Sequence, residues 1–118
     1  MAKRIAAIGT LAACATWGSD GASAQDQVQA GRALALQACT GCHVVAPDQP
    51  FKPVYTGVPH PPDFQEIANR SDATADSLRR HLSALPAVPE DLHMANPILS
   101  SQQLRDVVAF IISLRGNR

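Results

Sequence analysis

The sequence predicts an all-α domain in which short helices are joined by long loops. Apolar residues recur at three- and four-residue spacing in separate segments, and several of these segments open with a good capping residue. Six of the nine prolines lie between residues 46 and 62, which excludes a long helix or a central strand there. No segment alternates apolar and polar residues well enough to indicate a strand. The 118 residues suffice for one domain.

The first 24 residues have the layout of a cleaved secretory signal peptide, which leaves residues 25–118 as the domain. A basic pair at residues 3–4 precedes an apolar run too short to span a bilayer, which takes about 20 residues. Residues 22–24 read Ala-Ser-Ala, a typical cleavage site. The alternative is a lipoprotein signal over residues 1–13, because Leu-Ala-Ala precedes Cys14. Both predict export to the periplasm, with membrane attachment only if Cys14 carries a lipid.

Charge and composition narrow the function classes. The formal net charge is zero, so nothing indicates binding to nucleic acid or to a strongly charged membrane surface. The predicted domain keeps two cysteines, Cys39 and Cys42. A disulfide between such close neighbours would close only a very short loop and add little stability. It also has few aromatic side chains to fill a core: Phe51, Tyr55, Phe64 and Phe110. A large, flat, apolar cofactor would supply the missing volume.

The first half of the domain should hold one helix and one long loop. Residues 26–38 carry apolar residues at helical spacing, and the cysteine pair follows directly at the end of this helix. The Pro-rich loop then occupies residues 46–62. After it, Asp63 and Glu66 form a capping box for a short helix over residues 64–69.

Two further helices are expected in the second half. Thr74 should cap a helix over residues 75–85, which Pro86 ends. A second loop over residues 87–99 leads to Ser100, which with Gln103 starts the last helix. The buried face of that helix is predicted to consist of Leu104, Val107, Val108, Ile111 and Leu114.

Residues 39–43 read Cys-Thr-Gly-Cys-His, the signature of covalent haem attachment. The two intervening residues set the thiols of Cys39 and Cys42 at the spacing of the two haem vinyl groups, to which they form thioethers. The histidine that follows, His43, then lies over the iron as proximal ligand. A zinc site is a poorer interpretation because no second cysteine pair exists. A thioredoxin-like centre would need the motif at the start of a helix, after a strand.

The distal iron ligand is the second question that the sequence raises. Met94 is the only methionine apart from Met1, and it lies in the loop before the last helix. A thioether opposite an imidazole raises the haem potential and suits electron transfer. Met94 is therefore the predicted distal ligand. Alternatives are His93 as the ligand, an open distal position, or a methionine that only fills the core.

Over about residues 26–115 the chain resembles the class I c-type cytochromes of bacteria, which carry one haem with Met and His ligands. In that family a glycine eight residues before the first cysteine lets the first and last helices cross closely; Gly31 holds this position, with Phe110 as its expected partner. The resemblance also implies a loop proline whose carbonyl accepts a hydrogen bond from the proximal histidine, and Pro62 is the candidate. The chain departs from the family in having Ala95, where many members have proline after the methionine.

The predicted function is that of a one-electron carrier with a single covalent haem c, not an enzyme. It would be a monomer that meets redox protein partners transiently, over a small interface. Two other roles stay open. The chain could be the haem subunit of a dehydrogenase or oxidase complex, or an open-site haem enzyme or sensor with peroxidase or gas-binding chemistry.

Overall fold

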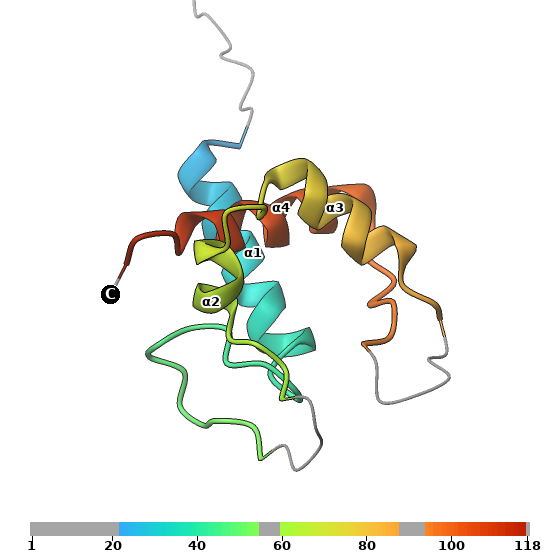
Figure 1. Ribbon diagram of the computed structural model, residues 1–118. Helices are drawn as coiled ribbons and strands as arrows, with labels where there is room; N and C mark the ends of the chain where they lie inside the picture. Colours follow the sequence, from blue (N-terminus) through green and yellow to red (C-terminus); the bar gives the residue numbers. More distant parts are fainter. Residues whose placement is uncertain (1–21, 55–59, 88–93, 118) are drawn as a thin grey trace, which may run out of the picture.

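The computed structural model describes residues 22–54, 60–87 and 94–117. Within these residues the protein has four helices and no strand: α1 (Ala24–Ala38), α2 (Phe64–Asn69), α3 (Ala75–Ala84) and α4 (Ser101–Ser113) (Figure 1). The predicted all-α architecture of short helices and long loops is confirmed. Most of the predicted signal peptide, Cys14 and the alternative ligand His93 lie outside the described residues.

Local capping explains where the helices begin. Thr74 and Ser100 cap α3 and α4 through hydrogen bonds to the third residue of each helix. Helix α1 begins two residues earlier than predicted because Ser23 forms a capping box with Asp26, whose backbone N–H donates to Ser23 Oγ at 3.1 Å. Helix α3 ends one residue early because Leu85 precedes a proline and is extended.

Helix α4 is the centre of the fold, since it packs against each of the other three helices, most extensively against α1. The two cross in Figure 1, where α4 runs over the middle of α1. A Cβ atom added to Gly31 would lie 1.9 Å from the backbone oxygen of Asp106 and 2.9 Å from Cβ of Phe110. The predicted close approach of Gly31 and Phe110 is therefore confirmed, and no side chain fits at residue 31.

The core lies on one side of α4 and continues onto α1, α2 and α3. Its buried apolar members are Ala35, Val45, Ala46, Phe64, Ala68, Leu82, Val107, Val108, Phe110 and Ile111. The predicted buried face of α4 needs a correction, because Leu104 and Leu114 are only half-buried. Asp106 is buried instead, and its carboxylate accepts a hydrogen bond from Gln102 Nε2 at 2.7 Å. Burial follows from the close approach of α1 at Gly31.

The C-terminal end of α4 is tied to the junction between α2 and α3. Arg115 donates from Nε to the carbonyl of Ala68 at 2.8 Å and from its guanidinium to the carbonyl of Ala73. The backbone N–H of Gly116 donates to Asn69 Oδ1 at 3.0 Å. These bonds satisfy carbonyls at the end of α2 and hold α2 in place beside the cysteine motif.

Candidate functional site

The cysteine motif leaves the end of α1 as a tight turn. Cys39 caps the helix, and its N–H donates to the carbonyl of Ala35 at 2.9 Å. The N–H groups of Cys42 and His43 both donate to the carbonyl of Cys39, at 3.3 and 3.0 Å. Thr40 is buried, and its hydroxyl donates to the carbonyl of Leu36 at 3.1 Å. The backbone thus fixes both thiols and the imidazole relative to α1.

The two thiols of the motif are free and differ in environment. Cys39 is half-buried and Cys42 is exposed, and no disulfide joins them. Burial raises the pKa of the Cys39 thiol to about 11. At neutral pH this sulfur is therefore a protonated thiol rather than the reactive thiolate.

The His43 imidazole is held in one orientation by a backbone carbonyl. The side chain is 8 % exposed, and Nδ1 lies 2.8 Å from the carbonyl oxygen of Pro62. A carbonyl can only accept, so Nδ1 carries the proton and the neutral ring keeps its lone pair on Nε2. The structure thus contains the contact that the resemblance implied for Pro62, and it leaves Nε2 as the nitrogen able to bind a metal.

Helix α2 explains why the Pro62 carbonyl lies where it does. The N–H of Phe64 donates to the carbonyl of Val44 at 2.9 Å, which pins the start of α2 to the residue after His43. The N–H of Asp63 donates to Glu66 Oε2 at 2.8 Å, so the turn into the helix is also fixed. Pro62 directly precedes these two anchored residues, which restrict the position of its carbonyl.

Aromatic packing connects His43 to the helix crossing. The ring centroids of His43 and Phe64 are 5.5 Å apart, with an interplanar angle of 53°. Those of Phe64 and Phe110 are 6.3 Å apart, at 52°. Both distances are in the range of favourable tilted ring contacts. The imidazole therefore contacts the side chain of Phe64, which is itself buried in the core.

The loop after the motif is organised by polar residues that the sequence analysis did not identify. The Gln49 side-chain oxygen accepts from the N–H of Val45 at 2.7 Å, and its Nε2 donates to the carbonyl of Phe51 at 2.5 Å. Arg32 of α1 donates to both carboxylate oxygens of Asp48, at 3.0 and 2.9 Å. The hydrogen bond from Arg32 is the main reason that the pKa of Asp48 lies below its usual value.

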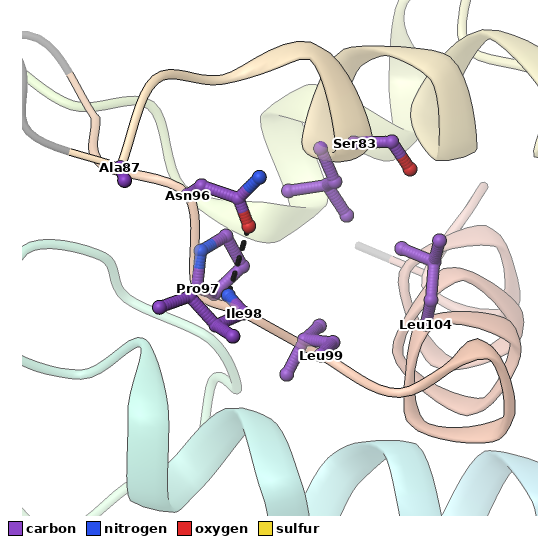
Figure 2. A pocket seen from close by; sticks show the side chains of 8 residues that line it. Ser83, Ala87, Asn96, Pro97, Ile98, Leu99 and Leu104 are labelled. Carbon is purple, nitrogen blue, oxygen red and sulfur yellow. Dashed lines mark hydrogen bonds between the residues drawn. The ribbon is translucent and has the colours of Figure 1, made fainter.

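Met94 lies in the loop before α4, in the second half of the chain. It is half-buried and packs against the core cluster to which Phe64 and Phe110 belong. A groove of about 310 Å³ opens beside this loop, between α3 and the start of α4 (Figure 2). It is lined by Leu82, Ser83, Ala87, Asn96, Pro97, Ile98, Leu99 and Leu104. The structure thus brings Cys39, Cys42, His43 and Pro62 together, and Met94 packs against the core to which His43's neighbour Phe64 belongs.

Among the residues that the structure describes, no helix is long and apolar enough to cross a membrane. In the same part of the chain, no group of three or more His, Cys, Asp or Glu side chains could together hold a metal ion.

The chain matches the model of a known protein family. The family model described as Cytochrome c matches residues 28–115, which run from the first turns of α1 to the residue that clamps the end of α2. No curated protein and no solved structure matches the chain.

Proposed function

Because the chain belongs to the cytochrome c family, we propose that it is an exported one-electron carrier with a single haem c. The family match supports electron transfer through haem as the general role. The proposal adds that Cys39 and Cys42 hold the haem and that His43 and Met94 are its axial ligands. A bound haem c would supply the one-electron couple of its iron.

The donor set of the described residues fits this group. Two free thiols stand three residues apart on one turn, as attachment to two neighbouring vinyl groups requires. Each attachment adds S–H across one vinyl C=C, with sulfur on one carbon and hydrogen on the other, so no oxidant is needed. The protonated state of Cys39 agrees with that balance.

The observation that carries the proposal is the hydrogen bond between His43 and Pro62. At 2.8 Å it fixes the tautomer, aims the imidazole and directs the Nε2 lone pair away from the loop. The arrangement resists rotation of the ring, which keeps the ligand geometry constant while the iron changes charge.

Met94 supports the electron-carrier role over an open-site enzyme or sensor. It is the only methionine in the described residues, and it packs half-buried on the core. A thioether in the distal position occupies the site that peroxides or gases would need.

The test is replacement of the proposed distal ligand. The ferric wild type should show the iron–thioether charge-transfer band, and Met94→Ala should lose it and bind carbon monoxide in the ferrous state. Leu99→Ala is the control, because it removes a half-buried apolar side chain from the same loop without removing the thioether. If the wild type lacks the band and binds cyanide or carbon monoxide as readily as Met94→Ala, the electron-carrier proposal fails.

Export and the maturation site form a separate part of the proposal. Cleavage after Ala24 would remove Ser23, which caps α1, whereas a lipidated Cys14 would retain it. A mass spectrum of the purified protein separates the two forms and weighs the haem at the same time. A mass for an intact chain that begins at Met1 would overturn export.

A further inference from the structure

Asn96 joins the Met94 loop to the end of α3 with two hydrogen bonds and takes part in a third within the loop. Its backbone N–H donates to the carbonyl of Pro86 at 2.9 Å, and its side-chain Nδ2 donates to the carbonyl of Leu85 at 3.1 Å. Its Oδ1 accepts from the N–H of Ile98 at 2.8 Å (Figure 2). The half-buried side-chain amide therefore donates to one backbone group and accepts from another, one at the end of α3 and one in the loop.

Two of these bonds fix Asn96 to Leu85 and Pro86, directly after α3. Met94 lies two residues before Asn96 in the sequence, so its backbone is restrained close to this anchor. Any movement that opens the loop at this end has to break the bonds of Asn96 or carry the end of α3 along.

The backbone at Ile98 shows that the loop needs such a restraint. Ile98 has φ 52°, a conformation that costs a β-branched residue roughly 1–2 kcal/mol. Its side chain is 80 % exposed, so burial does not compensate for this cost. The hydrogen bond from its N–H to Asn96 Oδ1 is the contact that holds the strained turn.

Packing restrains only part of the loop. Met94 and Leu99 pack against the core, whereas Ala95 and Ile98 are exposed. Figure 2 shows Asn96, Ile98 and Leu99 along the open groove between α3 and α4. Side chains beside an open groove lose contacts that a packed core would provide. The geometry of the loop therefore depends in part on directional hydrogen bonds.

We propose that Asn96 is the positioning residue that keeps the Met94 thioether seated in the distal position. The inference rests on the proposed function, since it assumes that Met94 is a ligand. In this role Asn96 sets the population of a state in which Met94 has left the distal position. An exogenous ligand binds that open state alone, so its apparent affinity rises in proportion to the open population.

The experiment measures imidazole binding to the full ferric protein with its haem, by optical titration. In Asn96→Ala, two side-chain hydrogen bonds are lost while the backbone bond to Pro86 remains. Two bonds at about 1 kcal/mol each should raise the open population about thirtyfold, so the apparent imidazole Kd should fall about thirtyfold. Asn96→Asp keeps the acceptor for Ile98 but loses the donor to Leu85, and should also bind more tightly than the wild type.

Asn117→Ala is the matched control, because it removes an amide whose Nδ2 donates to the carbonyl of Ser113 at 3.1 Å, far along the chain from the loop. Its imidazole Kd should equal that of the wild type. An effect on general stability alone would lower the denaturation midpoint of Asn96→Ala and leave imidazole affinity unchanged where the protein is folded.

Two failures can be told apart. If the wild type shows the charge-transfer band but Asn96→Ala and Asn96→Asp bind imidazole within twofold of Asn117→Ala, the role of Asn96 is wrong and the electron-carrier proposal stands. If the wild type has no band and binds imidazole as tightly as Met94→Ala, the proposed function itself fails.

Discussion

The His43 side and the Met94 side of the proposed haem site are held by different kinds of interaction. The residue His43 is 8 % exposed, and its ring is hydrogen-bonded to the Pro62 carbonyl and in contact with Phe64, which in turn contacts Phe110 at the helix crossing. The loop of Met94 borders an open groove and is tied to the end of α3 through the backbone and the side chain of one residue, Asn96. The His43 side is buried in the core, whereas the Met94 side packs against the core from a partly exposed loop.

This difference teaches that the two ligands should fail in different ways. Displacing His43 requires disruption of buried aromatic packing, which is a large part of the total stability of a small domain. Displacing Met94 requires the loss of a few hydrogen bonds in a strained loop. Local opening is therefore expected on the Met94 side, at free energies well below that of global unfolding.

The largest effect is expected from Phe64→Ala. Phe64 is 5 % exposed and contacts both His43 and Phe110, so its loss should cost about 3–5 kcal/mol in the free energy of unfolding. Denaturant unfolding of the haem-loaded chain measures this. The control is Phe51→Ala, since Phe51 is 58 % exposed and its loss should cost less than about 1 kcal/mol. If the two variants lost the same free energy of unfolding, the conclusion that the core holds His43 would be wrong.

A smaller loss is expected from Gly31→Ala, which tests the crossing that supports Phe110. The new Cβ would lie 1.9 Å from a backbone oxygen of α4, so the helices must move apart, at a cost of about 2–3 kcal/mol. The same unfolding experiment applies, with Ala30→Val as control because residue 30 is an exposed neighbour on α1. If Gly31→Ala were as stable as the wild type, the two helices could move apart at this crossing without a measurable cost.

The helices could be predicted from the sequence because capping and periodicity are local properties. Ser100 with Gln103 and Thr74 sit at the helix starts as expected. Ser23 was missed because the same three residues, 22–24, also have the features of a cleavage site. Asp106 was missed because its charge indicates exposure, and only the approach of Gly31 from another helix buries it.

The residues of the proposed site also differ in whether local sequence or only long-range contacts reveal them. The Cys39 to His43 motif is contiguous and needs no tertiary structure to be identified. The Pro62 contact was suggested only by resemblance, because six prolines crowd that loop and nothing local selects one. Gln49 and Asn96 gave no signal, since a polar residue in an irregular loop acquires its role only when particular backbone groups meet it.

The smallest effect is expected from Ile98→Asn. This variant tests whether backbone strain at residue 98 weakens the hold on Met94. Asparagine tolerates positive φ better than a β-branched residue, and little buried surface is lost at an 80 % exposed side chain. The variant should gain about 0.5–1 kcal/mol in unfolding free energy, whereas Ile98→Val keeps the β-branch and should gain nothing. Since the relieved strain belongs to the Met94 loop, imidazole should also bind to Ile98→Asn less tightly than to the wild type. A gain in stability with unchanged imidazole affinity would separate the turn at Ile98 from the seating of Met94, and the loop could then no longer be treated as one unit.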